Sequence, residues 1–384
     1  MTRTIIDINI LQTVPPSNIN RDDTGSPKTA VYGGVRRARV SSQAWKRATR
    51  VAFNGLLDRE DLGIRTKRVV ELLGDRIHEK DSDIPVERAQ ELAALAFAAA
   101  GIKLTAARKS TKENPLPDES GYLLFLSARQ LGHLADAAIA ADATDDASAY
   151  LKSAGLKKSL DLKHSVDLAL FGRMVADATD LNVDAAAQVA HAISVHPVET
   201  EFDYFTAVDD HKAADDAEDA GAGMIGTVEF SSSTLYRYAT VDVDRLHDNL
   251  GDADGGDAVA TQRAVEAFLQ AFSRSMPRGK QNTFANRTLP DAIVISVRDS
   301  QPVNLVGAFE EAIRGGSRLG RASAALAEHA TNVDDAYGTA PVATWVVRAM
   351  PAAESLDRLG EKVSLDDAVK RVGALVAERL KDVQ

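Results

Sequence analysis

Apolar residues alternate with polar ones, or run together, in six segments that are typical of β-strands. The first, residues 4–14, should end at Pro15 and Pro16, and a short second strand is predicted at residues 35–40. The other four segments are residues 199–207, 234–243, 292–297 and 343–348. Strands are therefore expected toward both ends of the chain.

Helical spacing replaces this pattern between residues 59 and 194, where alanine is abundant. Apolar positions recur there at intervals of three and four residues, which predicts helices. The clearest segments are residues 86–100, 122–141 and 183–194. Two more amphipathic helices are predicted near the carboxyl end, at residues 258–273 and 365–380, the second with Ser364 as its N-cap.

The order of these elements predicts an α+β fold. Without the helical middle, the order is strand, helix, strand, strand, helix, strand, which is the ferredoxin-like pattern of RNA-recognition modules. We expect a ferredoxin-like (RRM-like) palm in two parts, residues 1–58 and 195–384, interrupted by a large helical insertion (fingers) at residues 59–194. The acidic, alanine-rich residues 209–223 separate two strands, so residues of about 199–226 should form a long hairpin (thumb).

Composition narrows the functional classes. The chain has 384 residues and a formal net charge of -11, with 45% hydrophobic and 26% charged residues, as in ordinary folded soluble proteins. It has no cysteine, so disulfides and thiolate metal sites are excluded. The amino terminus is too polar for a signal peptide and no long apolar run follows, so we expect a cytoplasmic protein with no membrane partner.

A basic segment, residues 36–50, interrupts this acidic chain. It contains no acid and six cations: Arg36, Arg37, Arg39, Lys46, Arg47 and Arg50. Ser41 and Ser42 offer N-cap hydroxyls, so a helix should begin there, with an N-terminus that favours anions. One face of this helix would carry Gln43, Lys46, Arg47 and Arg50. The segment predicts a track for a phosphodiester backbone; the alternative is a solvated basic helix face.

Two loops add cations to this prediction. Residues 17–34 show little periodicity and contain Arg21 and Lys28, which are candidates to fold onto the ligand. The second loop, residues 277–287, carries Arg278 and Lys280 and is a candidate for contact with the RNA backbone. The alternative for the first loop is a flexible surface segment.

Carboxylates and histidines give little support for catalysis. Asp22-Asp23 and Asp209-Asp210 could in principle hold a magnesium ion for phosphodiester cleavage, but no base or further ligand is placed nearby. Asp22 and Asp23 are expected to pair with arginines or with a neighbouring subunit. His191 and His196 lack the spacing of a zinc motif and are expected to be structural. We therefore expect no catalytic residue, no metal and no cofactor.

Three blocks of sequence carry a resemblance to a known family. The first joins Asn20-Arg21-Asp22-Asp23 and Gly33-Gly34 to RRARVSSQAWKRATR, and the second is EFDYFTAVDD, residues 201–210, followed by GTVEFSSS. The third is SMPRGKQNTFA, residues 275–285. In this order the blocks resemble the CasC family, which is the backbone subunit of the type I-E CRISPR surveillance complex, Cascade, within the RAMP superfamily.

The resemblance implies partners and further site residues. Its implied partners are the CRISPR RNA, target DNA through guide pairing, other Cascade subunits, and other copies of the chain stacked head to tail as a filament for antiviral defence. The segment Phe171-Gly-Arg-Met is similar to a family motif whose methionine lies against an RNA base. The residues that the resemblance adds to the RNA-binding set are Arg173, Met174, Phe202, Tyr204 and Phe205. From the residues alone, Met174 and the three aromatic side chains could equally be core.

Two functions from different classes remain open. One is a non-catalytic RNA-binding subunit that polymerises along a guide RNA. The other is a ferredoxin-like ribonuclease that processes CRISPR RNA. The long basic track and the lack of a convincing acid–base pair favour the first.

Overall fold

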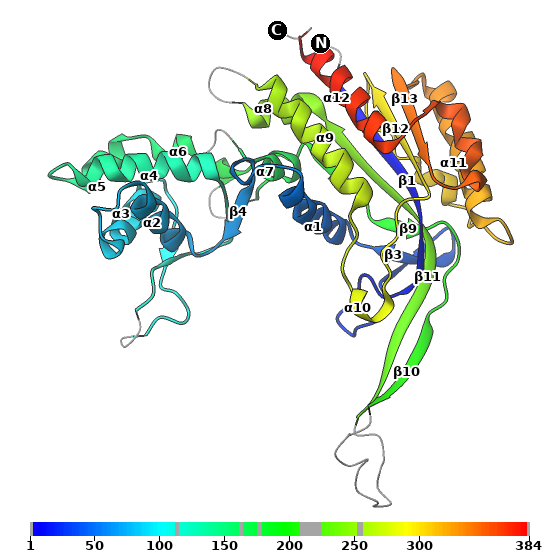
Figure 1. Cartoon of the computed structure of the whole chain (residues 1–384), viewed down its shortest axis with the longest axis horizontal. Helices are drawn as coiled ribbons and strands as arrows, with labels where there is room; N and C mark the ends of the chain where they lie inside the picture. Colours follow the sequence, from blue (N-terminus) through cyan, green and yellow to red (C-terminus); the bar gives the residue numbers. More distant parts are fainter. Residues whose placement is uncertain are drawn as a thin grey trace, which may run out of the picture. The chain divides into compact units, whose positions relative to one another are not determined.

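The computed structural model describes residues 3–111, 115–160, 164–174, 179–207, 224–251 and 256–381. These residues form an α+β fold with one large sheet and many helices, as predicted (Figure 1). The chain divides into two compact units. The first unit contains residues 1–52, 189–240 and 268–372, and the second contains residues 53–188, 241–267 and 373–384.

A large sheet is the frame of the first unit. Its strand order is β14–β13–β12–β1–β11–β9–β3–β2, and β10 pairs with β11 outside this path. β12 is antiparallel to both β1 and β13, whereas β13 and β14 are parallel. The bounds are β1 Ile5–Ser17, β2 Thr29–Tyr32, β3 Val35–Val40, β9 Ala192–Ser194, β10 Glu201–Ala207, β11 Met224–Asp242, β12 Ala292–Arg298, β13 Ala343–Arg348 and β14 Glu361–Lys362.

β1 has a neighbour on each side and is buried almost continuously along its first half. It was predicted to end at the prolines, but it continues through Pro15 and Pro16 to Ser17. Its pairing with β12 ends at Leu11, so neither proline lies at a position where that ladder needs an N–H donor. Proline is tolerated in extended backbone where no N–H is needed.

Helices cover both faces of this sheet. α11 (Arg318–Tyr337), η5 (Leu305–Phe309) and η6 (Pro351–Leu359) pack on one face, in a core that includes Tyr236 and Val294 from the strands. Successive strand residues point to opposite faces. Arg237 therefore lies on the other face, where it contacts α1 (Ser42–Ala52) and the last turns of α9 (Ala258–Arg274). The short helix α10 (Gln281–Phe284) and the start of α12 (Leu365–Lys381) complete the unit.

Several predicted elements are correct and three are wrong in whole or in part. The strands at residues 292–297 and 343–348 and the helix at residues 86–100 are confirmed. Ser364 caps α12 by accepting a hydrogen bond from the Asp367 N–H at 3.1 Å. Residues 183–194, predicted as a helix, instead contain β8 (Ala187–Val189) and β9, because β9 completes ladders with β3 and β11. β2 lies in a segment that was predicted as a loop. Residues 124–127, predicted as the start of a helix, form the strand β7 instead.

The second unit is mostly helical. Its core joins apolar side chains of α2 (Val69–Lys80), α3 (Val86–Ala99) and α4 (Ala128–Asp142). Helix α8 (Val243–Leu250), which we placed in the palm, clusters with this unit. The remaining bounds are η1 Phe53–Gly55, η2 Arg59–Asp61, β4 Gly63–Thr66, β5 Leu104–Thr105, β6 Glu119–Ser120, β7 Leu124–Ser127, α5 Ala147–Ser153, α6 Leu156–Ser159, α7 Val166–Phe171 and η3 Thr179–Leu181. No helix in the described part of the chain is both long and apolar enough to cross a membrane.

β10 and β11 form an antiparallel ribbon at the place of the predicted hairpin (Figure 1). Its register runs from Glu201 opposite Phe230 to Ala207 opposite Met224. The acidic stretch at residues 209–223 and the pair Asp209-Asp210 lie outside the described residues. The paired residues 201–207 and 224–230 therefore correspond to the base of the predicted hairpin.

We expect Gly33→Ala to lower the free energy of unfolding by about 2–4 kcal/mol. This value adds the cost of a left-handed backbone conformation for alanine to the cost of overpacking. Gly33 lies in the turn between β2 and β3 at φ +58°, and an added Cβ would lie 1.6 Å from the carbonyl oxygen of Glu310. Gly34→Ala is the matched control, because Gly34 has φ +74° but no atom within 4 Å of such a Cβ. Urea denaturation measures both, and equal losses would contradict the role assigned to close packing.

Candidate nucleic-acid interface

The amino end of α1 is capped and tied to the preceding loop. The Ser41 hydroxyl accepts a hydrogen bond from the Ala44 N–H at 3.3 Å, so the predicted cap is confirmed at Ser41. The Ser41 N–H in turn donates to Oδ1 of Asn20 at 2.8 Å. The start of the helix and the loop that contains Arg21 are therefore held together.

The side chains on the basic face of α1 differ in their exposure to solvent. Gln43 and Arg47 are exposed, whereas Lys46 and Arg50 are half-buried. Burial lowers the pKa of Lys46. The opposite side of the helix buries Trp45 and Thr49. The predicted row of polar and cationic side chains therefore lies on the outward side of a helix fixed to the sheet.

A buried arginine holds this helix in place. The Arg237 guanidinium carbon lies 3.7 Å from the centre of the Trp45 ring and 4.6 Å from that of Phe272. Its Nη1 donates to Oε1 of Gln12 at 2.6 Å, and its Nη2 donates to the carbonyl of Phe272. Burial lowers the pKa of Arg237 to about 9. Cation–π contact with both rings compensates part of this desolvation.

One cation of the basic segment does not reach the surface. Arg37 is fully buried, and its guanidinium donates to the carbonyls of Tyr32 (3.1 Å), Ser194 (3.0 Å), Phe309 (2.8 Å) and Glu310 (3.1 Å). Its place in the basic segment predicted an anion-binding role for Arg37, which is wrong. Arg37 instead joins the β2–β3 hairpin to β9 and η5, because these four acceptors leave it no contact with solvent.

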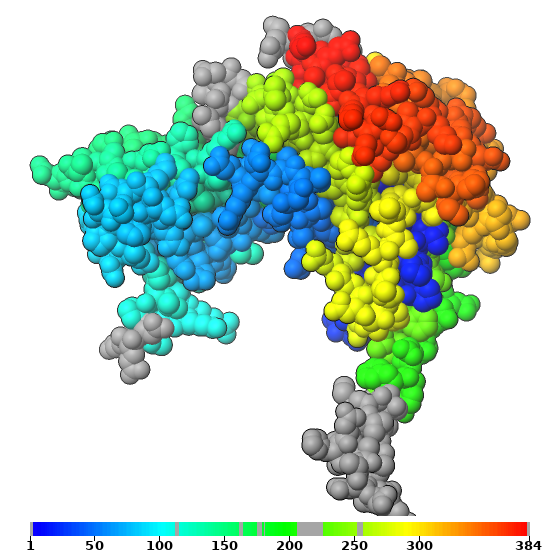
Figure 2. All heavy atoms as spheres, viewed as in Figure 1, coloured from blue at the N-terminus to red at the C-terminus, as the bar shows by residue number. Residues whose placement is uncertain are grey.

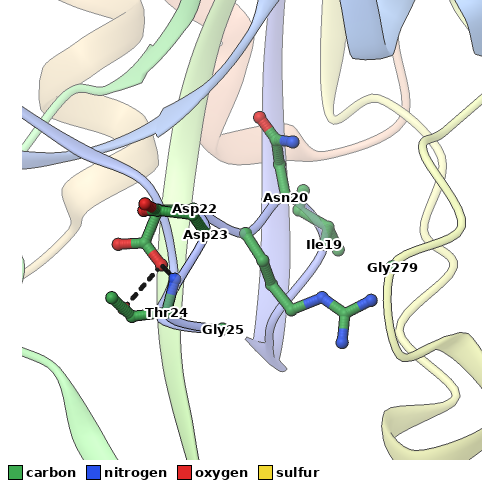
Figure 3. A pocket seen from close by; sticks show the side chains of 8 residues that line it. Ile19, Asn20, Asp22, Asp23, Thr24, Gly25 and Gly279 are labelled. Atoms are coloured by element: carbon green, nitrogen blue, oxygen red, sulfur yellow. Dashed lines mark hydrogen bonds between the residues drawn. The ribbon is translucent and has the colours of Figure 1, made fainter.

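The loop before β2 forms an open pocket of about 510 Å³ with Gly279 on its rim (Figure 3). Arg21 is exposed there. Asp22, expected to pair with an arginine or with a neighbouring subunit, accepts hydrogen bonds within its own loop, from the Thr24 hydroxyl at 2.8 Å and from the N–H of Ser26 at 2.9 Å. The hydrogen bond from Thr24 is the main reason that the pKa of Asp22 is lowered. Asp22 therefore shapes the turn that presents Arg21.

The second predicted loop lies against the first. A Cβ on Gly279 would be 2.3 Å from the carbonyl oxygen of Ile19, so only glycine permits this approach. Arg278 is exposed and Lys280 half-buried. Lys280 has a left-handed backbone at φ 48°, a strained conformation of the kind found at binding sites. Figure 2 shows the segment around α10, in yellow, next to the amino-terminal segment, in blue.

The aromatic side chains of the ribbon are exposed. Phe202 is 67% exposed, Tyr204 is 64% and Phe205 is 37%, so the alternative that all three are core is wrong for this chain. Phe205 lies across Gly226 on β11, where an added Cβ would be 2.4 Å from its ring. Exposed aromatic rings are features on which proteins stack the bases of single-stranded nucleic acid.

The two candidates in the second unit have opposite environments. Arg173 is buried and donates to the carbonyls of Leu181 (2.6 Å), Phe125 (3.2 Å) and Leu160 (3.0 Å). Its guanidinium is therefore internal, which corrects its assignment as an RNA contact. Met174 is 89% exposed, so it is not a core residue of this unit. Arg173 fixes the backbone from which Met174 projects.

Histidines and carboxylates show no metal-type grouping among the residues that the structure describes. His196 is buried, and Nε2 accepts a hydrogen bond from the Thr234 N–H at 3.1 Å. Burial lowers its pKa to about 4, so it is neutral near pH 7. His191, which was predicted to be structural, is by contrast exposed and contacts Arg39. Arg39 was among the predicted cations of residues 36–50, whereas its contact with His191 was not predicted.

Together these features define an α+β protein whose first unit presents cations and aromatic rings of the kind that bind single-stranded nucleic acid. The chain belongs to the CT1975-like protein family, whose model matches residues 6–371.

Two solved structures are similar over nearly the whole chain. One is a chain of a "CRISPR RNA-guided surveillance complex, pre-nicking", with 34% identity and a TM-score of 0.79 over 97% of this chain and 100% of that chain. The other, from a "CRISPR RNA-guided surveillance complex", has 30% identity and a TM-score of 0.70 over 97% of this chain and 99% of that chain. No curated protein matches the sequence significantly.

Proposed function

We propose that this chain is a guide-RNA-binding backbone subunit of a type I-E CRISPR surveillance complex, of the CasC type. In this proposal, copies bind a CRISPR RNA head to tail, together with other Cascade subunits, and present the guide for pairing with target DNA. The palm is ferredoxin-like, the β10–β11 ribbon is the stem of the thumb, and the protein acts in the cytoplasm without catalysing a reaction.

The observation that carries the proposal is the joint presence of a full-length structural match and a matching surface chemistry. The match at 34% identity covers 97% of this chain, so it includes both units. The exposed Arg47 on α1, Arg21 in its loop and Arg278 belong to elements that the hydrogen bond between Ser41 and Asn20 and the approach of Gly279 to Ile19 hold side by side. An extended set of cations suits a backbone that continues past each protein copy.

The proposal is tested by mixing the protein with single-stranded RNAs of increasing length and measuring the mass of the complexes by size-exclusion chromatography with light scattering. We expect the number of protein copies to rise with RNA length, and the RNA to remain intact. One protein per RNA at every length, or RNA that is shortened during the incubation, would favour the ribonuclease alternative.

A charge variant makes this test specific to α1. Arg47→Ala should weaken binding to all RNA sequences alike and reduce the slope of log affinity against log salt by about 0.7, as expected for one lost phosphate contact. Arg371→Ala, an exposed arginine on α12 that pairs with Glu361, is the matched control and should leave the slope unchanged. Equal effects of the two variants would contradict a binding role for α1.

A further inference from the structure

A histidine and an arginine meet at the ladder between β3 and β9 in the first unit. Arg39 lies opposite Ile193, two residues after His191. Its Nη1 is 3.2 Å from Nδ1 of His191, and its Nε donates to the carbonyl of Thr29 at 3.2 Å. Arginine only donates hydrogen bonds, so Nδ1 accepts and Nε2 of His191 carries the ring hydrogen. The Nε2–H group of this exposed imidazole is therefore a hydrogen-bond donor beside the Arg39 guanidinium.

A lysine joins this pair. The carbonyl of Lys28 accepts a hydrogen bond from the Arg39 N–H at 2.8 Å, so the two backbones are adjacent. Lys28 and Arg39 line a small hollow of about 20 Å³ together with residues that include Asn20, Ser231 and Ser233, and His191 lies beside Arg39 outside this lining. The described residues that line it include two cations and no acid. Cationic, amide and hydroxyl groups around a hollow of this size can receive one anionic oxygen.

The positive charge of the site favours the binding of an anion. Burial lowers the pKa of His191, and the charges of Arg39 and Lys28 lower it further. The positive charges of Arg39 and Lys28 thus disfavour a third positive charge on His191. A bound phosphate would reverse the sign of the local field and favour the protonated imidazole.

We propose that Lys28, Arg39 and His191 form a phosphate-binding subsite for one phosphodiester group of single-stranded RNA. Arg39 and Nε2 of His191 donate hydrogen bonds to the phosphate oxygens, and Lys28 supplies a second charge. The subsite rests on the proposed function, and it extends the RNA-binding surface from α1 to the β3–β9 ladder.

The subsite makes RNA binding depend on pH. In the free protein the pKa of His191 lies below its ordinary value, and a phosphate next to the ring raises it. Binding then takes up a proton, so the affinity rises as the pH falls through the pKa of the complex. A difference of one pKa unit between complex and free protein corresponds to a tenfold change in affinity.

The experiment measures binding of a fluorescent oligouridylate by fluorescence anisotropy at about pH 6 and about pH 8, the range in which histidine titrates. Uridine has no group that titrates in this range. For the wild type we expect the affinity to be about threefold to tenfold higher at the lower pH. His191→Gln, which keeps a neutral donor, should remove this dependence. His133→Gln, at an exposed histidine on α4, should retain it.

Arg39→Gln provides an independent measurement. It should reduce the salt slope by about 0.7 at either pH, because one cation–phosphate contact is lost. Circular dichroism checks that each variant is folded. The subsite is overturned if His191→Gln keeps the full pH dependence or if Arg39→Gln leaves the salt slope unchanged. A wild type that binds no RNA at either pH would instead overturn the proposed function, and the subsite with it.

Discussion

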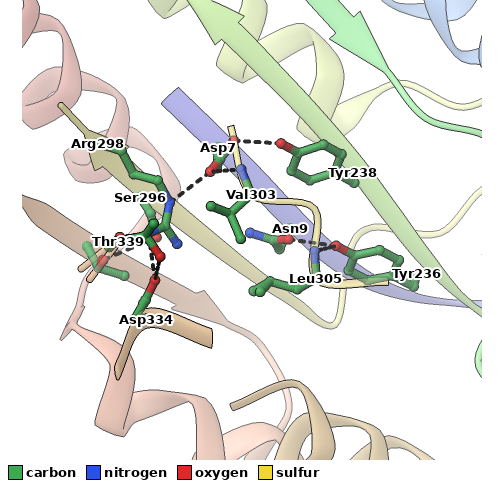
Figure 4. Close-up of polar contacts among 11 residues, drawn as sticks. Asp7, Asn9, Tyr236, Tyr238, Ser296, Arg298, Val303, Leu305, Asp334 and Thr339 are labelled. Carbon is green, nitrogen blue, oxygen red and sulfur yellow. Dashed lines mark hydrogen bonds and ion pairs between the residues drawn. The ribbon is translucent and has the colours of Figure 1, made fainter. Parts of the chain in front are cut away.

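Replacing Asp7 with alanine should lower the free energy of unfolding by about 3–5 kcal/mol, the usual effect of breaking a buried ion pair from one side. Asp7 is fully buried on β1, where Oδ1 accepts a hydrogen bond from the Tyr238 hydroxyl at 2.7 Å (Figure 4). Its Oδ2 accepts from Nε of Arg298 at 2.9 Å and from the N–H of Val303 at 3.0 Å. The substitution would leave three donors without this acceptor, two of them on the buried side chains of Tyr238 and Arg298.

Burial dominates the electrostatics of this carboxylate. It raises the pKa of Asp7, although the hydrogen bonds from Tyr238 and Val303 and the charge of Arg298 act in the opposite direction. Because the pKa is higher in the folded than in the unfolded chain, this group alone makes the protein less stable as the pH rises above 3.8 toward the folded-state pKa. The carboxylate is nevertheless needed, since it shares with Asp334, at 2.7 Å, the neutralisation of the Arg298 guanidinium, which is 2% exposed.

Chemical denaturation of the wild type and Asp7→Ala measures this effect. Asp357→Ala is the control, because Asp357 forms an ion pair of similar length with Arg348, at 2.7 Å, near the surface. Asp357 is only partly buried, and the loss of a pair that contacts solvent leaves no charge fully desolvated, so the control should lose less stability. Similar losses in the two variants would show that burial of the Asp7 network has no special importance.

The second large effect is expected at Arg237. Arg237→Ala should lower the free energy of unfolding by about 3–5 kcal/mol, because it opens a cavity between Trp45 and Phe272 and removes the donor to Gln12. RNA affinity should fall as well, because Arg237 packs on Trp45 and so holds in place the helix that carries Arg47.

Arg237→Met separates packing from charge at this position. Methionine fills most of the space without a charge to desolvate, and buried charges can often be replaced by apolar side chains of similar volume at little loss. Burial lowers the pKa of Arg237 to about 9, so the charge is penalised at every pH below that value, and stability should rise as the pH passes above it. We expect the methionine variant to be more stable than the alanine variant. Identical stability of both variants and the wild type would show that α1 is held by other contacts.

Local pattern was sufficient for elements whose character is set by neighbouring residues. The apolar run at residues 292–297 is buried at every position in β12, and the spacing of residues 86–100 matches α3. The Ser41 cap and the basic face of α1 also followed from sequence alone, since a cap and a helical face depend only on short intervals. An α+β fold with a basic segment was therefore predictable.

Tertiary contacts decided which cations face solvent. Arg36 is exposed and Arg37 is buried, although they are adjacent and chemically identical. The difference arises because Ser194 and Phe309, more than a hundred residues away, supply the carbonyls that Arg37 needs. Arg173 is internal for the same reason.

The same principle explains the wrong element at residues 183–194 and the contact of His191 with Arg39, which the sequence did not predict. Residues 187–194 have a helical pattern, yet they pair with β3 and β11 because sheet partners outweigh local propensity. His191 reaches Arg39 only through that pairing. The sequence by itself determined the periodicity of the elements and the amount of charge in each segment. The tertiary structure alone decided which side of each element is covered, because the covering groups come from distant parts of the chain.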